Sequence, residues 1–305
     1  MSKPNLEIKI GSMTMKNPVT VASGTLGYGP EYAELVDLHR LGALTVKGIC
    51  PEAHLGNATP RTFETRGGML NAIGLPGPGA KGFIEKYVPF LKQYDVPVIV
   101  NIWGKGMEDY GRVVDLLDAE DTVTAYEINL SCPNVKEGGS AFGTDVDMFS
   151  RVIELVRGKT QKPIIPKLAP NVTNIGLFAK AAEDCGADAV AIMNSYPAMA
   201  INIETLQPEL ANRSGGLSGP AIKPIAVKLV WDAAQATKLP IIGMGGIFEP
   251  EDAIEFMVAG ATAVAVGTAN FVDPTTVNRV IDGIEAYLVR KGHSSVEDIV
   301  GTAQA

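Results

Sequence analysis

Short, nearly continuous apolar runs recur along the chain, and each is followed by a longer stretch whose apolar residues return every three or four positions. Continuous apolar runs are typical of strands buried on both faces of a parallel sheet, and the longer spacing is typical of helices packed against that sheet. The predicted strands are Val19–Ser23, Leu44–Lys47, Pro97–Asn101, Tyr126–Leu130, Ile164–Leu168, Ala189–Met193, Pro240–Gly243 and Ala263–Val266. The predicted helices are Pro30–Leu41, Ala80–Tyr94, Met107–Leu117, Asp145–Arg157, Asn174–Cys185, Pro220–Thr237, Pro250–Ala259 and Pro274–Lys291.

Eight strand–helix pairs predict an α/β fold, a (β/α)8 TIM barrel, as a single domain over residues 1–305. Barrels of this type take about 250 residues in one domain, and the GxGxxG fingerprint of an open dinucleotide-binding sheet is absent after the first strand. The segment Leu6–Met15 is predicted to form a short N-terminal hairpin at the bottom of the barrel. The loops after the second, fourth and sixth strands are long, and in a barrel they lie at the face that carries the active site.

Composition narrows the functional classes. The 305 residues carry a net charge of −8, which argues against a nucleic-acid partner because nucleic-acid-binding proteins present basic patches. The three cysteines, Cys50, Cys132 and Cys185, form no CxxC pair, so neither a disulfide framework nor a zinc site is expected. The first nine residues are polar, and no apolar run approaches the roughly 20 residues of a membrane span. We therefore expect a cytoplasmic protein with no membrane partner.

Polar or glycine residues at the ends of the predicted strands are the main functional signal. The carboxyl ends of barrel strands meet at one rim, so these residues are predicted to converge. Buried lysine and asparagine side chains are costly unless they contact each other or a ligand. The residues are Ser23, Gly24, Lys47, Gly48, Asn101, Asn129, Lys167, Asn194, Ser195, Gly245, Gly246, Gly267 and Thr268.

Two glycine-bearing segments follow the seventh and eighth strands, GMGGI at Gly243–Ile247 and VGTANF at Val266–Phe271. In barrels these two loops form the usual phosphate site, because glycine leaves backbone N–H groups open to an anion. A tight turn alone would also explain glycine, which adopts positive φ without steric cost. Two such loops at the two expected strand ends favour phosphate binding.

Lysines in the second and fifth predicted strands each require a partner. Lys47 either pairs with a buried carboxylate or serves a ligand, and the residues alone leave both possibilities open. Lys167 lies between Pro166 and Leu168 in a strongly apolar strand, so its charge must meet a buried group. A flavin that gains negative charge on reduction is a suitable partner.

Cys132 lies in the segment NLSCPN, Asn129–Asn134, directly after the fourth strand. A single cysteine is most often an inert, small apolar residue, and this is the prediction for Cys50 and Cys185. Cys132 differs because it stands in a polar strand-end loop on the face that carries chemistry. A thiol with an ordinary pKa of about 8.5 is suited to act as a general base.

Taken together, these segments resemble the class 1 dihydroorotate dehydrogenases over essentially the whole chain. The resemblance is carried by VASGTLGYG (Val21–Gly29), TVKG (Thr45–Gly48), NAIGL (Asn71–Leu75), NLSCPN, PKL (Pro166–Leu168), NRSGGLSGPAIKP (Asn212–Pro224), GMGGI and VGTANF. Cys132 indicates class 1, because class 2 members have serine at the position of the base. NAIGL and the GYG after the first strand are more similar to the NAD-linked class 1B than to the fumarate-using class 1A.

The resemblance implies flavin-dependent oxidation of dihydroorotate to orotate in pyrimidine biosynthesis. Cys132 would remove a proton from the ring methylene while a hydride leaves for FMN. The residues implied to hold FMN are Ser23, Lys47, Gly48, Asn101, Asn129, Lys167, Met193, Gly219, Gly245, Gly246, Gly267 and Thr268. The residues implied to hold the substrate are Lys47, Asn71, Ala72, Ile73, Gly74, Leu75, Asn129, Asn134, Asn194 and Ser195.

The resemblance also implies partners. Electrons would pass to NAD through a second subunit that carries FAD and an iron–sulfur cluster, bound to a homodimer of this chain. Three cysteines are too few to supply cluster ligands as well as a base, which agrees with a separate cluster-bearing subunit. No metal is expected in this chain itself.

The chain departs from the family pattern in three places. Ser195 is followed by Tyr196–Ala198 where a Gly-Met step is usual, Met193 replaces a usual isoleucine, and NAIGL is followed by Pro76–Gly79. A proline at position 197 would stiffen the loop. The alternatives are an FMN barrel acting on another dihydropyrimidine such as dihydrouracil, a flavoprotein that only relays electrons, and a phosphosugar barrel without flavin.

Overall fold

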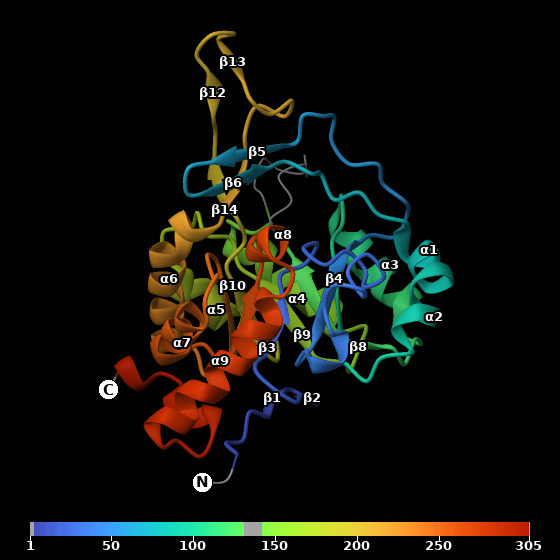
Figure 1. Cartoon of the computed structure of the whole chain (residues 1–305). Coiled ribbons are helices and arrows are strands. Elements are labelled where there is room, and N and C mark those ends of the chain that lie inside the picture. The colour runs from blue at the N-terminus through green and yellow to red at the C-terminus, as the bar shows by residue number, and fades with distance from the viewer. Residues whose placement is uncertain (1–2, 131–141, 305) are drawn as a thin grey trace.

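The computed structural model describes residues 3–130 and 142–304, and their centre is a barrel of eight parallel strands surrounded by helices (Figure 1). Neighbouring strands pair in parallel throughout, and the first barrel strand pairs with the last. The predicted (β/α)8 fold and its eight strands are therefore confirmed. The strand order is β3 (Val19–Val21), β16 (Ala263–Val266), β15 (Ile241–Met244), β10 (Val190–Ile192), β9 (Ile164–Lys167), β8 (Val123–Asn129), β7 (Val98–Ile102) and β4 (Leu44–Ile49).

The first and last strands in this order, β3 and β4, are joined by side chains. The Thr20 and Thr45 hydroxyls lie 3.0 Å apart, and both residues are buried. The Ser23 hydroxyl donates a hydrogen bond to the Val46 carbonyl at 3.0 Å. Buried hydroxyls need such partners, and here each partner belongs to the opposite edge of the barrel. The barrel is therefore closed between β3 and β4 by hydroxyl groups.

Helices cover the outside of the barrel, and their polar ends are capped in the usual way. Asp145 accepts hydrogen bonds from the amides of Asp147 and Met148, and Asn174 accepts one from the amide of Leu177. The α-helices are α1 (Gly79–Lys86), α2 (Val88–Leu91), α3 (Met107–Leu117), α4 (Val146–Arg157), α5 (Ile175–Asp184), α6 (Lys223–Ala236), α7 (Pro250–Ala259), α8 (Ala269–Val272) and α9 (Thr276–Lys291). Shorter 3-10 turns are η1 (Leu38–Arg40), η2 (Pro220–Ile222), η3 (Val296–Ile299) and η4 (Thr302–Gln304). Within the described ranges, no helix is both long and apolar enough to cross a membrane.

Two helix predictions were wrong in detail. The segment 30–41 forms turns and η1 rather than an α-helix. The Asp37 carboxylate accepts a hydrogen bond from the His39 amide, and the Glu31 carboxylate accepts one from the Tyr28 amide. Such side-chain acceptors compete with the backbone hydrogen bonds of a helix. The predicted helix 80–94 is divided into α1 and α2, because Pro89 has no N–H to donate to the preceding turn.

The predicted N-terminal hairpin is confirmed as β1 (Ile8–Ile10) paired with β2 (Met13–Met15). The outer residues of both strands are buried and the middle residue of each is exposed. Figure 1 shows this hairpin below the barrel, at the end opposite to the long strand-end loops. It covers the bottom of the barrel with apolar side chains, as the alternating pattern predicts.

The long loops after β4 and β10 fold together into a second sheet above the barrel, which the sequence did not predict (Figure 1). Its order is β11 (Tyr196–Ala198), β14 (Gly215–Ser218), β6 (Gly68–Asn71) and β5 (Thr62–Thr65), all antiparallel. A small hairpin of β12 (Ile201–Asn202) and β13 (Gln207–Pro208) projects beyond it. This sheet joins two loops that are more than 100 residues apart in the chain.

Candidate active site

The predicted site residues within the described ranges lie at the carboxyl ends of barrel strands or in the loops directly after them. Lys47, Gly48 and Asn101 belong to β4 and β7, and Asn129 and Lys167 end β8 and β9. Directly after barrel strands come Ser23, Met193, Asn194, Ser195, Gly245, Gly246, Gly267 and Thr268. The predicted residues Asn71–Leu75 and Gly219 lie farther along the loops after β4 and β10, where they follow strands of the second sheet or end one. The predicted base Cys132, together with Asn134, lies outside the described residues.

A buried ion pair lies near the carboxyl ends of β8 and β9. The Lys167 ammonium is 3.5 Å from Glu127 Oε1, and the two residues are only 6% and 3% exposed. Asn101 donates a hydrogen bond from Nδ2 to the same Glu127 oxygen at 2.6 Å. Among the described residues, Asn101 Oδ1 is buried without a hydrogen-bond partner. A buried unpaired acceptor is costly, so this oxygen indicates a donor supplied by a ligand.

Lys47 is half-buried at the end of β4 and has no carboxylate within ion-pair distance in the part of the chain that the structure describes. Burial lowers the pKa of Lys47, the Arg61 guanidinium lowers it further, and Glu31 offsets part of the effect. The pairing of Lys47 with a buried carboxylate, which the sequence left open, is thus absent among these residues. The ammonium remains available to an anionic ligand.

Asparagine side chains connect the ends of β8 and β10. Asn194 donates from Nδ2 to Asn129 Oδ1 at 3.3 Å, and the Ser195 amide donates to Asn194 Oδ1 at 2.9 Å. Tyr110, on α3, donates its hydroxyl to the Asn129 carbonyl at 2.8 Å. The structure therefore brings together three residues that the sequence predicted to contact the substrate.

The second sheet positions the loop Asn71–Leu75 over the barrel. Asn71 pairs with Gly216 across β6 and β14. Gly216 lies directly against Ser195, because a Cβ added to Gly216 would be only 1.9 Å from Ser195 Oγ. At the other end of the loop, Leu75 Cδ2 would lie 3.4 Å from a Cβ added to Gly48. The loop thus extends from the neighbourhood of Ser195 to that of Gly48, and it lies across the barrel mouth.

Three glycine-bearing segments meet beyond the ends of β15 and β16. Gly219, Gly245 and Gly246 have φ values of +103°, +128° and +77°, which favour glycine. A Cβ on Gly246 would lie 2.9 Å from the Gly219 carbonyl oxygen. The Thr268 hydroxyl donates to the Ser218 hydroxyl at 2.8 Å. The two predicted phosphate loops are therefore joined by a third segment, 218–223.

Comparison with known proteins identifies the family. The model of the family described as dihydroorotate dehydrogenase matches residues 5–288. The chain belongs to the dihydroorotate dehydrogenase family. It is 50% identical to the protein of Geotalea uraniireducens (strain Rf4) named "Dihydroorotate dehydrogenase B (NAD(+)), catalytic subunit", over 301 residues and 99% of each chain. Proteins with the same name are 50% identical in Citrifermentans bemidjiense, over 100% of each chain, and 51% identical in Thermoanaerobacter pseudethanolicus, over 98% of each.

The class 1B resemblance read from the motifs is thus confirmed for this member of the dihydroorotate dehydrogenase family. Sequence reasoning nevertheless missed Glu127, the partner of Lys167. A signal was present, because Glu127 is a charged residue two positions before Asn129 and therefore on the same face of the strand.

Sequence reasoning also missed Asn57, which supports the predicted substrate loop of this dehydrogenase. Asn57 donates from Nδ2 to the Ala72 carbonyl at 2.9 Å, and its amide donates to the Ile73 carbonyl at 3.1 Å. A Cβ on Gly74 would lie 2.5 Å from the Asn57 nitrogen, so the two segments are in close contact. No sequence pattern pairs position 57 with position 72, because the contact depends on how the long loop folds back.

Proposed function

We propose that this chain is a dihydroorotate dehydrogenase that oxidises dihydroorotate to orotate in pyrimidine biosynthesis, as a single FMN-binding barrel domain. The observation that carries the proposal is about 50% identity over 98–100% of proteins named as NAD-linked catalytic subunits. The converging strand ends support it, because two lysines and several asparagines meet at one barrel mouth.

FMN is the proposed cofactor, and the residues present fit it. The unpartnered acceptor of Asn101 and the ammonium groups of Lys47 and Lys167 suit a polar ring that gains negative charge on reduction. The positive-φ glycines 219, 245 and 246, with Gly267 and Thr268, suit a phosphate. Ser23, Gly48, Asn129 and Met193 complete the proposed cofactor site. When bound, FMN supplies an acceptor for the hydride.

The remaining residues bind the substrate and move a proton. Lys47 would neutralise the carboxylate of the substrate, while Asn71–Leu75, Asn129, Asn134, Asn194 and Ser195 would hold its ring. Cys132 would accept the proton of the ring methylene as general base. A dry site covered by the loop Asn71–Leu75 would keep water from competing for these groups.

The proposed partner is an electron-transfer subunit. The relatives are named "catalytic subunit" and "NAD(+)", which implies a second chain between this site and NAD. We assign FAD and an iron–sulfur cluster to that subunit, bound to a homodimer of this chain. Three cysteines are too few to ligate a cluster in addition to supplying a base. The reducing cytoplasm is the proposed location of the complex.

The deciding experiment is a flavin absorbance spectrum during anaerobic addition of dihydroorotate. Bleaching of the flavin band would support both cofactor and substrate. If dihydrouracil bleaches the band and dihydroorotate does not, the substrate is another dihydropyrimidine. If the flavin is reduced only through a partner subunit, the protein is an electron relay. Purified protein without flavin would favour the phosphosugar barrel.

The base is tested by Cys132→Ser. Loss of the thiol should slow turnover by about 10²- to 10⁴-fold while FMN stays bound, since general-base catalysis contributes that factor. Cys185→Ser is the matched control, because Cys185 is the C-cap residue directly after α5, on the outside of the barrel. Unchanged turnover in Cys132→Ser would remove Cys132 from the mechanism.

A further inference from the structure

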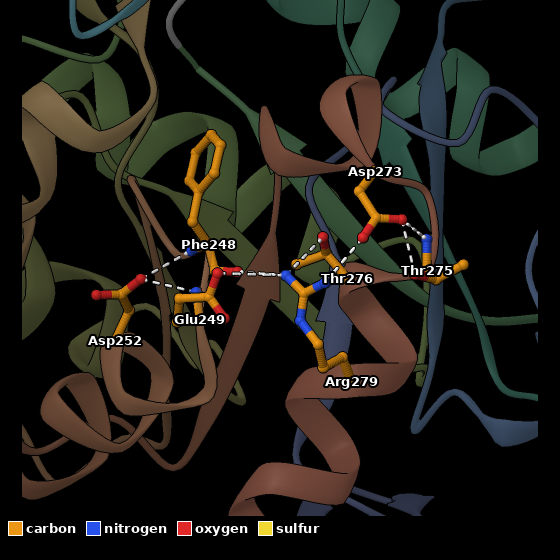
Figure 2. Close-up of polar contacts among 7 residues, drawn as sticks. All are labelled: Phe248, Glu249, Asp252, Asp273, Thr275, Thr276 and Arg279. Atoms are coloured by element: carbon orange, nitrogen blue, oxygen red, sulfur yellow. Dashed lines mark hydrogen bonds and ion pairs between the residues drawn. The ribbon is translucent and has the colours of Figure 1, made fainter.

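Arg279, on α9, connects the loops that follow β15 and β16. Its NH1 group is 2.8 Å from Asp273 Oδ2, and its NH2 group donates to the Phe248 carbonyl at 3.1 Å and lies 3.4 Å from Glu249 Oε1. Figure 2 shows the guanidinium between these two loops. Phe248 follows the glycine loop Gly243–Ile247, and Asp273 follows α8, which begins directly after Thr268. One side chain thus joins residues just after both predicted phosphate loops.

Asp252, on α7, holds the first of these loops from the other side. Its Oδ2 accepts hydrogen bonds from the amides of Phe248 and Glu249, both at 2.9 Å. In Figure 2 the two amides face Asp252, while the Phe248 carbonyl is directed toward Arg279. The main chain of Phe248 is therefore held at both its N–H and its carbonyl by ionised side chains, which make the stronger hydrogen bonds.

Lys223 extends the connection to the third segment of the site. Its ammonium lies 2.7 Å from Asp252 Oδ1, and it begins α6, four residues after Gly219. A Cβ on Gly246 would lie 2.8 Å from Lys223 Cβ, so the Lys223 side chain packs directly against the glycine loop. The segments that carry Gly219, Gly246 and Thr268 are thus linked behind the site.

We propose that Arg279 and the Lys223–Asp252 pair are positioning residues for the phosphate of FMN. The inference rests on the proposed function, because it presupposes FMN at this end of the barrel. Glycines have no side chains with which to fix their own orientation, so the direction of their N–H groups depends on neighbouring bonds. Arginine suits this role better than lysine, because the N–H groups of its planar guanidinium point toward two loops in fixed directions.

A purely structural role for Arg279 makes a different prediction. The Arg279 and Asp273 side chains are 43% and 40% exposed, and ion pairs of such exposure contribute little to stability. Loss of a structural contact would lower the affinity for all flavins together. Loss of a phosphate-positioning contact would lower the affinity for FMN but not for riboflavin, which has the same ring and no phosphate.

The test is titration of the full-length apoprotein with FMN and with riboflavin, followed by flavin fluorescence. Arg279→Gln should weaken FMN binding by roughly tenfold, which corresponds to about 1.4 kcal/mol, and leave riboflavin binding within about twofold. Arg279→Lys should give an intermediate loss for FMN. Asp252→Asn is a second variant with the same expected selectivity, for the case in which the Arg279 variants do not fold.

Glu285→Gln is the matched control, because Glu285 lies on the same helix and pairs with Lys3 at 3.1 Å, away from both loops. It should change neither affinity. The proposal is overturned if Arg279→Gln and Asp252→Asn leave FMN binding unchanged, or weaken FMN and riboflavin equally. If the wild-type protein itself binds no FMN, the proposed function fails instead, so the two failures are distinguishable.

Discussion

Glu127 Oε1 lies 3.5 Å from the Lys167 ammonium, and both side chains are almost completely buried near the carboxyl ends of adjacent strands. Asn101 donates to the same oxygen at 2.6 Å. Charges interact strongly in such an environment, because little water is present to screen them. The carboxylate therefore reduces the positive potential that Lys167 presents to any ligand at the barrel mouth.

Glu127→Gln should make the proposed FMN easier to reduce. Removing the negative charge leaves the Lys167 cation uncompensated, and a cation stabilises the charge that reduction adds to the ring. The flavin midpoint potential should rise by roughly 30 mV, equal to about 1.4 kcal/mol for a two-electron couple. Redox titration of the protein with bound FMN measures this shift.

The control for this prediction is Asp115→Asn. Asp115 pairs with Lys159 at 2.8 Å on the outside of the barrel, so its loss should leave the flavin potential unchanged. Glu127→Gln should also lower thermal stability, because it leaves the buried Lys167 ammonium without its carboxylate partner. A potential that stays the same or falls in Glu127→Gln would show that Lys167 does not act on the flavin.

Arg61→Gln should move the alkaline limit of substrate binding to higher pH. Burial and then the Arg61 guanidinium lower the pKa of Lys47, so removing the guanidinium raises the pKa of Lys47. The protonated Lys47 that binds an anion then persists to higher pH. The measurement is the orotate dissociation constant across about pH 8 to 11, around the ordinary pKa of lysine.

The neighbouring Arg66→Gln serves as the control for Arg61, because Arg66 is exposed on the same β5–β6 hairpin. Its pH profile should match that of the wild-type protein. An alkaline limb that does not move, or that moves to lower pH, in Arg61→Gln would contradict the role assigned to the Arg61 charge.

Gly48→Ala should destabilise the fold and weaken flavin binding. The added Cβ would lie 2.9 Å from Asn101 Oδ1 and 3.0 Å from Trp103 Cδ1, both buried. Overpacking of this kind costs about 1–3 kcal/mol in the free energy of unfolding, which chemical denaturation measures. Gly106→Ala is the comparison, because nothing lies within 4 Å of its added Cβ. Equal stability of the two variants would mean that the strand end adapts without cost.

Asn57→Ala should raise the KM for dihydroorotate and leave the affinity for FMN unchanged. The substitution removes the bond from Asn57 Nδ2 to the Ala72 carbonyl and so loosens the loop Asn71–Leu75. We expect an increase of roughly tenfold, the equivalent of about 1.4 kcal/mol. Asn212→Ala removes an exposed amide bond to Ser214 and should have no effect. Parallel losses of substrate and FMN affinity in Asn57→Ala would indicate a general loss of structure.

The sequence by itself determined the eight strands, the short hairpin and the glycine loops at the barrel mouth. These features depend on local physical chemistry: the period of apolar residues, the conformational freedom of glycine and the connection of each strand to the next helix. The motifs at the strand ends also sufficed to identify the family.

Only the tertiary structure decided which side chains meet. The Glu127–Lys167 pair depends on the register between β8 and β9, and the second sheet depends on contacts between loops more than 100 residues apart. Arg279 joins its two loops for the same reason, since α9 packs beside both. Such contacts carry no local periodicity, because they arise only when the closed barrel brings distant strand ends to one rim.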